Sequence, residues 1–179
     1  MGNTKVSDIS FLNNLKNMKK LYLKECKEIN NFMPLSNLTK LEEIGLGDTK
    51  ISDISFLEKN TNIINLYLWK CKNIIHFWPL SLLSKIEYID IGETNISELS
   101  FLEKNKNIKY LFLKECKINN FEFIYKLKNM EELGLGDTNI PDISFLENNK
   151  NIKELYLDGC KNINKNDKIF QRKDIIIHY

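Results

Sequence analysis

Apolar and polar residues alternate along this chain in a unit of about 22 residues that recurs almost from end to end. The first apolar residues of the seven units are Met18, Leu41, Ile63, Ile86, Ile108, Met130 and Ile152. Positions 4 and 6 of each unit are also apolar, which predicts a short strand with these side chains directed inward. A fixed period of this length predicts a solenoid in which each unit adds one strand to a parallel sheet.

Two different strand sequences, called phrases here, alternate along the chain, so the full repeat consists of two units. Leu-Tyr-Leu-Lys-Glu-Cys-Lys at 21–27 recurs with small changes at 66–72, 111–117 and 155–161. Ile-Gly-Leu-Gly-Asp-Thr at 44–49 recurs at 89–94 and 133–138. Position 9 is thus Thr in one kind of unit, and in the other it is Cys26, Cys71, Cys116 and Cys160. Equivalent cysteines two strands apart lie about 10 Å from each other, too far for a disulfide, so we expect four buried, reduced thiols in one column.

The back halves of the units carry a second kind of repeated phrase, such as Ile-Ser-Asp-Ile-Ser-Phe-Leu at 51–57 and Phe-Met-Pro-Leu-Ser-Asn-Leu at 32–38. Together the phrases resemble the 22-residue leucine-rich repeats of bacterial internalins and of the phosphatase-1 regulatory subunit class, over roughly residues 3–165. The resemblance implies an α/β solenoid: a right-handed superhelix of parallel strands with mostly 3₁₀ or irregular segments on its convex side. We expect a single leucine-rich repeat domain over residues 1–179, with about seven full repeats and a degenerate capping unit at 164–179.

The N-terminal phrase begins inside a repeat, because residues 1–12 align with residues 46–57. The chain is therefore interpreted either as a fragment of a longer array or as a shortened gene product. Apolar residues such as Val6, Ile9 and Leu12 are expected to lack a preceding unit to cover them. An uncapped edge strand invites pairing, so we expect either self-association through this edge or fraying of it.

Positions 3, 5 and 7 face outward on the strands and predict the binding surface. Large aromatic residues there alternate with glycines such as Gly45, Gly47 and Gly92. Aromatic residues are frequent in interface hot spots. The candidate partner-binding residues on this concave face are Tyr22, Lys24, Tyr67, Trp69, Tyr88, Tyr110, Phe112, Lys114 and Tyr156. The competing interpretation is structural, with each ring lying over a neighbouring glycine to shield the backbone.

Composition and motifs argue against several other functions. The net charge of +2 indicates neither nucleic-acid binding nor membrane insertion, and no stretch approaches 18 apolar residues. His76 and His178 lie far apart in the sequence, and neither is beside a plausible nucleophile. Acidic residues at position 8 are expected to pair with lysines at position 10, with a cation site as the weaker alternative. We therefore predict no catalytic residues, no cofactor and no metal site.

These observations favour a non-enzymatic leucine-rich repeat module that binds a protein or peptide on its concave aromatic face. Two alternatives remain open: a fragment of a bacterial internalin-like surface adhesin, and the substrate-recognition segment of a larger effector enzyme. A complete chain would be cytoplasmic, whereas an adhesin fragment would be secreted or displayed at the surface.

Overall fold

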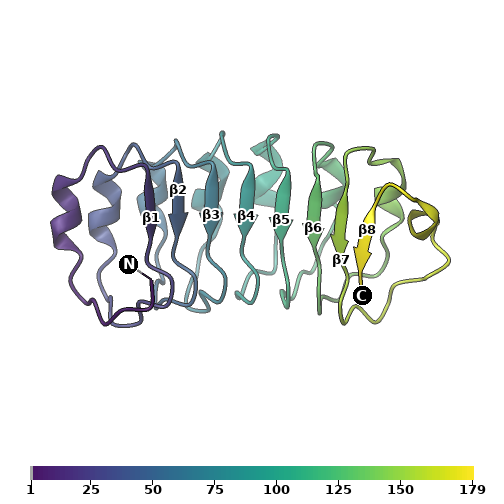
Figure 1. The fold of residues 1–179 in the computed structure, drawn as a ribbon, viewed down its shortest axis with the longest axis horizontal. Helices are drawn as coiled ribbons and strands as arrows, with labels where there is room; N and C mark the ends of the chain where they lie inside the picture. The colour runs from purple at the N-terminus through teal and green to yellow at the C-terminus, as the bar shows by residue number, and fades with distance from the viewer. Residues whose placement is uncertain (1) are drawn as a thin grey trace.

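A computed structural model describes residues 2–179, apart from the side chain of Asn148. Within this range eight short strands form one parallel sheet in sequence order, and they lie side by side in Figure 1. The strands are β1 Lys20–Tyr22, β2 Glu43–Gly45, β3 Asn65–Tyr67, β4 Tyr88–Asp90, β5 Tyr110–Phe112, β6 Glu132–Gly134, β7 Glu154–Tyr156 and β8 Ile176–His178. The predicted solenoid is confirmed.

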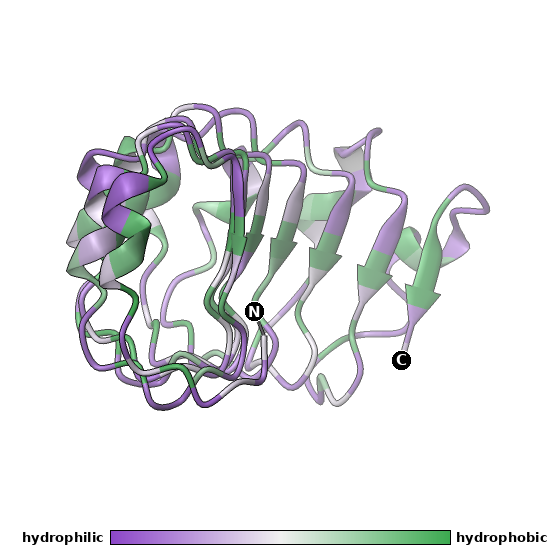
Figure 2. Ribbon diagram, turned by 60° about the vertical axis from the view of Figure 1, so that its left-hand side comes forward, coloured by the Kyte–Doolittle hydropathy of each residue, from purple (hydrophilic) through white to green (hydrophobic). Residues whose placement is uncertain are grey.

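Short 3₁₀ segments form the wall opposite the sheet, as Figure 2 shows. They are η1 Ser10–Asn14, η2 Met33–Asn37, η3 Ser55–Glu58, η4 Trp78–Leu82, η5 Ser100–Lys104, η6 Ile124–Lys126, η7 Ser144–Asn148 and η8 Lys168–Gln171. The Asp53 carboxylate starts η3 by accepting a hydrogen bond from the Ser55 N–H at 2.8 Å, whereas Pro79 lies in the first turn of η4. The prediction of 3₁₀ segments on the convex side is confirmed.

The core lies between the sheet and the 3₁₀ segments, because strand side chains alternate between two faces. Leu66 at position 4 of β3 is in register with Ile89 of β4, and both are fully buried. Leu68 at position 6 is buried as well. Positions 3, 5 and 7 consequently lie on the opposite face of the sheet, as the alternation predicts.

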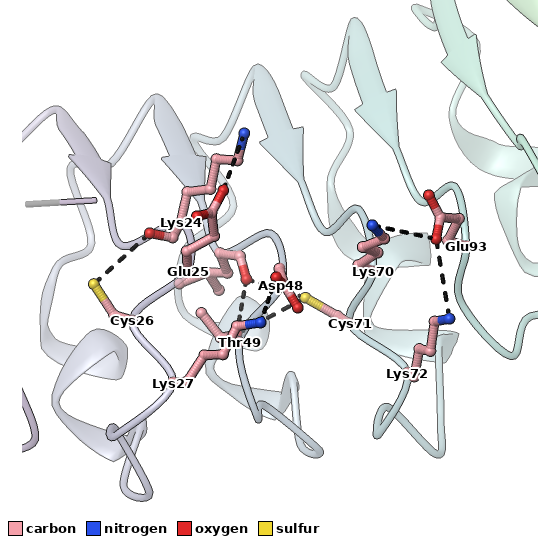
Figure 3. A network of polar contacts seen from close by, with 11 residues as sticks. Lys24, Glu25, Cys26, Lys27, Asp48, Thr49, Lys70, Cys71, Lys72 and Glu93 are labelled. Carbon is pink, nitrogen blue, oxygen red and sulfur yellow. Dashed lines mark hydrogen bonds and ion pairs between the residues drawn. The ribbon is translucent and has the colours of Figure 1, made fainter. Parts of the chain in front are cut away.

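A tight turn follows each of the strands β1 to β7, and its residue at position 8 adopts a left-handed conformation. The positive φ angles belong to Asn3, Glu25, Asp48, Lys70, Glu93, Glu115, Asp137 and Gly159. In this conformation the Glu25 N–H reaches the Gly47 carbonyl of the next unit at 2.8 Å. Two acidic members pair with lysines at position 10, Asp48 with Lys27 at 2.7 Å and Glu93 with Lys72 at 3.9 Å (Figure 3). The expected compensation between the two charged rows is therefore found for these two pairs.

Buried hydrogen bonds join neighbouring units at position 9. The Thr49 hydroxyl donates to the Leu46 carbonyl at 2.7 Å, and the Cys71 thiol of the following unit donates to the same carbonyl at 3.1 Å. The same arrangement links Cys116 to the Ile91 carbonyl at 3.2 Å. The column therefore contains alternating Thr and Cys side chains. It satisfies the turn carbonyls of successive units.

The thiol column differs from its prediction at one end. Cys26, Cys71 and Cys116 are buried, but Cys160 is only half-buried because the C-terminal unit covers it incompletely. Among the described residues, none of the four cysteines forms a disulfide. Burial raises the pKa of Cys71 to about 11 and also raises that of Cys116, which suppresses the reactive thiolate.

We expect a thiol reagent such as 5,5′-dithiobis(2-nitrobenzoic acid) to modify Cys160 first in the native protein, with the other three thiols reacting only after denaturation. The reason is the difference in exposure and thiolate population. Mass spectrometry of the partly labelled protein locates the modified residue. A Cys160→Ser variant is the control and should show no fast phase. Fast labelling of Cys71 would contradict this assignment.

A second set of buried hydrogen bonds lies behind the 3₁₀ segments. The Asn60 amide donates to the Leu35 and Leu38 carbonyls at 3.2 and 2.7 Å, and it is fully buried. Asn105 is equally buried and donates to the Leu80 and Leu83 carbonyls. These asparagines end the Phe-Leu-Glu-Lys-Asn phrase of alternate units. They are structural residues that the sequence analysis did not single out.

The N-terminal segment is better covered than its sequence predicts. Ile9 and Leu12 are buried, and Val6 is half-buried, so the expectation that they lack cover is wrong for the first two. A core residue in a solenoid packs against the opposite wall of its own coil as well as against neighbouring coils. In addition, the Asn3 N–H donates to the Lys24 carbonyl at 2.7 Å. Self-association through the β1 edge stays a prediction.

The C-terminal unit closes the array with η8 and β8. Arg172, the single arginine of the chain, donates to the Asn149 carbonyl at 2.6 Å and pairs with Asp174 at 2.7 Å. Its guanidinium therefore occupies the place that Asn60 and Asn105 take in earlier units. Through Arg172, the degenerate segment at 164–179 donates a hydrogen bond to the end of the preceding 3₁₀ segment, η7, as the asparagines do in earlier units.

Candidate binding face

The sheet face opposite the 3₁₀ segments, termed the concave face, consists of positions 3, 5 and 7 of the units. Strand register sets its rows, because Tyr67 is aligned with Gly45 on one side and with Asp90 on the other. Asp90 is aligned in turn with Phe112. All nine predicted binding residues lie on this face. Their role in binding is taken up below as a proposal.

Most of the aromatic rings form one continuous row of contacts. The Tyr67 and Tyr88 ring centroids lie 4.7 Å apart, and Tyr88 contacts Tyr110 at 5.8 Å and Phe112 at 5.3 Å. Tyr22 lies 6.5 Å from Tyr67 across a glycine unit. Such spacings are favourable for aromatic pairs. The rings consequently hold one another in place without a ligand.

Two of the rings also lie over glycines, as the competing interpretation requires. A methyl group at Gly45 would come within 2.8 Å of a Tyr22 ring carbon, and one at Gly134 within 2.6 Å of a Phe112 ring carbon. Only glycine leaves room for these rings. Because Tyr22 remains 43% exposed, covering the backbone does not remove its outer face from solvent. The two interpretations are therefore compatible.

A hollow of about 400 Å³ opens on the concave face over β1 to β4. It is lined by Tyr22, Lys24, Gly45, Gly47, Tyr67, Trp69 and Asp90. The glycines form its floor because they lack side chains, and the aromatic residues form its walls. Ligand sites are commonly concave, mostly apolar and supplied with a few polar groups. Four of the predicted binding residues are therefore brought together at one depression.

Trp69 is held by contacts within the chain. Its indole N–H donates to the Glu93 carboxylate at 3.0 Å. The Lys70 ammonium lies 4.2 Å from the ring centroid, and that of Lys24 lies 5.4 Å from it. Cation–π contacts of this kind orient the indole. Trp69 is thus a fixed wall of the hollow.

The N-terminal end of the concave face is electrostatically balanced. Tyr22 donates its hydroxyl to Glu43, and this bond raises the pKa of Tyr22 to about 12. Lys20 pairs with the same carboxylate at 2.8 Å and is the main cause of its lowered pKa. The charges around Glu43 are therefore already compensated within the chain.

The centre of the face differs, because two carboxylates lack a cation. Within residues 2–179, neither Asp90 nor Glu132 forms an ion pair. Asp90 accepts a hydrogen bond from the Gly92 N–H at 3.1 Å. Burial raises the pKa of Asp90 and of Glu132, and the Glu154 charge adds to the effect at Glu132. The centre therefore carries uncompensated negative charge beside aromatic rings.

The C-terminal end contains residues that the sequence analysis did not assign to the face. His178 stacks on Tyr156 with ring centroids 4.4 Å apart, and Tyr156 donates its hydroxyl to Glu154 at 2.7 Å. Lys114 approaches Asp137 at 3.9 Å. Alignment of the last five residues with the strand phrase would have placed His178 at position 5. The signal was weak because the repeat decays after residue 163.

The repeats and this geometry agree with the comparisons to known proteins. A model of the BspA-type leucine-rich repeat region matches residues 1–119 and 85–169 in six copies. The chain belongs to the BspA-type leucine-rich repeat family. No curated protein matches this leucine-rich repeat chain.

Solved structures with the same fold are internalins and another leucine-rich repeat protein. Internalin C2 of Listeria monocytogenes has a TM-score of 0.87 at 27% identity, over 98% of this chain and 76% of that one. Internalin InlF of the same species has a TM-score of 0.75 at 22% identity, over 97% of this chain and 58% of that one. A leucine-rich repeat protein of Leptospira interrogans has a TM-score of 0.72 at 20% identity, over 97% and 52%. The last two likenesses show the fold alone.

Over its described residues, the leucine-rich repeat chain lacks the features of two other kinds of site. Among the described residues, no helix has the length and apolar character needed to cross a membrane. Across the same part of the chain, no three His, Cys, Asp or Glu residues are grouped as metal ligands.

Proposed function

We propose that the chain is a single, non-enzymatic leucine-rich repeat domain that binds a protein or peptide on its concave face. The observation that carries this proposal is the hollow over β1 to β4, where Tyr22, Tyr67 and Trp69 surround glycines. A solenoid presents one extended surface, and aromatic side chains are frequent among the residues that dominate binding energy. The family match and the likeness to internalin C2 support an interaction role.

The likeness to internalins favours one specific setting for this role. At 27% identity over nearly the whole chain, internalin C2 makes a fragment of a surface adhesin the second candidate. Recognition of a substrate for a larger effector enzyme would use the same face, with its chemistry located elsewhere. All three settings share binding by the concave face.

The test is to select peptides from a random display library on the immobilised chain and to map their footprint by amide chemical shifts. We expect selected peptides to shift the amides of Gly45 and Gly47, which line the hollow, and of Gly92, which donates to the hollow-lining Asp90. The convex residues around the exposed Trp78 serve as the internal control and should not respond. Binders that shift the 3₁₀ segments and leave the three glycines unchanged would refute the proposal.

A further inference from the structure

The concave face is acidic although the chain as a whole is basic. Positions 3, 5 and 7 of the strand units carry five carboxylates and three lysines, whereas the net charge of the whole chain is +2. The acidic residues are Glu43, Asp90, Glu132, Glu154 and Asp158, and the basic ones are Lys20, Lys24 and Lys114. A partner that meets this face gains from carrying positive charge.

Aromatic rings surround the Asp90 carboxylate. Strand register places Tyr67 on one side of Asp90 and Phe112 on the other, and Tyr88 lies two residues earlier on the same strand. The Tyr88 ring contacts both neighbours, at 4.7 Å from Tyr67 and 5.3 Å from Phe112. A carboxylate beside a cluster of aromatic rings offers a planar cation both an ion pair and a ring face.

One Asp90 oxygen remains available to such a cation. Oδ1 accepts the hydrogen bond of the Gly92 N–H. Oδ2 is not fully buried, so it remains accessible from the concave face. Asp90 also lines the hollow, so the carboxylate is accessible to a side chain that enters it. Because burial disfavours the free carboxylate, an incoming cation would supply missing compensation.

We propose that Asp90, together with Tyr67 and Tyr88, binds an arginine side chain of the partner, an inference that rests on the concave-face function proposed above. The guanidinium donates to the accessible Asp90 oxygen, and its plane lies against an aromatic ring. Arginine fits better than lysine because it is planar, weakly hydrated and suited to stacking.

The lysines of the hollow do not compete for this position. Lys24 follows β1, and its ammonium approaches Glu25 at 3.5 Å and lies 5.4 Å from the Trp69 ring centroid. Lys70 lies over Trp69 and approaches Glu93 at 3.7 Å. The arginine therefore binds at the Asp90 end of the hollow, away from Trp69.

The direct test is an NMR titration with N-acetyl-arginine methylamide and its uncharged isostere, N-acetyl-citrulline methylamide. The Gly92 amide reports on the site because it donates to Asp90. We expect saturable shifts of Gly92 with the arginine compound and affinity at least about tenfold weaker with citrulline. Equal responses to the two compounds, or no response of Gly92 to the arginine compound, would overturn the proposal.

A matched pair of variants separates the Asp90 charge from general attraction. Asp90→Asn keeps the shape and an oxygen for Gly92, and we expect it to bind the arginine compound about tenfold more weakly. Glu58→Gln removes one charge on the exposed convex side and should leave binding unchanged. A loss of the same size in both variants would show nonspecific attraction and refute a site at Asp90.

The display library distinguishes failure of this inference from failure of the proposed function. Peptides that shift the concave glycines, contain arginine and lose affinity for Asp90→Asn support both proposals. Peptides that shift those glycines but lack arginine and bind Asp90→Asn equally well refute the arginine site and leave the concave-face function in place. Peptides that bind elsewhere refute the function itself.

Discussion

Asn105→Asp is expected to lower the free energy of unfolding by about 3–5 kcal/mol at neutral pH, the usual cost of an uncompensated buried charge. The Asn105 side-chain amide donates to the Leu80 and Leu83 carbonyls at 3.1 and 2.8 Å, and its Oδ1 has no partner in the described part of the chain. Aspartate has nearly the same shape but replaces the donor by an oxygen that faces two other oxygens. Urea denaturation measures the loss.

Asn107→Asp is the matched control for this substitution. Asn107 also donates to a backbone carbonyl, that of Ser84 at 2.9 Å, but it is exposed, so we expect a cost below about 1 kcal/mol. The deficit of Asn105→Asp should shrink on acidification, because burial raises the pKa of the introduced carboxyl in the folded state and protonation removes the charge. Equal costs in the two variants at neutral pH would show that burial of Asn105 is not what matters.

Tyr67→Ala is expected to weaken the binding of peptides to the concave face by about 2 kcal/mol or more, which corresponds to a roughly thirtyfold increase in the dissociation constant. Tyr67 lies at the wall of the hollow and contacts the rings of Tyr22 and Tyr88 at 6.5 and 4.7 Å. Truncation removes its contact area and leaves both neighbouring rings less fixed. Fluorescence polarisation with the library-selected peptides measures the change.

Trp78→Ala is the control for the truncation of Tyr67, because Trp78 is 49% exposed on the convex side. It should leave peptide affinity unchanged. Trp69→Ala should lower both affinity and stability, since Trp69 also donates to Glu93 and carries the Lys70 contact. Unchanged affinity in folded Tyr67→Ala, or an equal loss in Trp78→Ala, would contradict the concave-face assignment.

Strand positions were predictable from sequence because the inward side chains repeat at a fixed spacing. Leu21, Ile44 and Leu66 stand at equivalent unit positions, and their strands pair in that register. The burial of Ile9 and Leu12 was not predictable from this pattern. The pattern shows which units are adjacent, but it does not show how the opposite wall of the same coil covers a residue. Asn60 and Asn105 were missed for a similar reason: their carbonyl partners lie 22 and 25 residues away.

The candidate face was predictable as a set of residues but not as a site. Alternation placed Tyr67, Trp69 and Tyr88 on one face, as the strands confirm. Whether a ring lies over a glycine, contacts another ring or receives a lysine depends on side-chain torsions that the pattern does not contain. Asp90 illustrates the limit, because its lack of a cation is visible only when all the neighbouring side chains are placed.

The buried polar contacts leave no weak junction among the first five units. Cys71 and Cys116 join the unit of β2 to that of β3 and the unit of β4 to that of β5. Asn60 and Asn105 join the unit of β1 to that of β2 and the unit of β3 to that of β4. The two kinds of contact therefore alternate, and each of these four junctions is crossed by one of them. An array whose adjacent units are all linked in this way should unfold as one cooperative block rather than coil by coil.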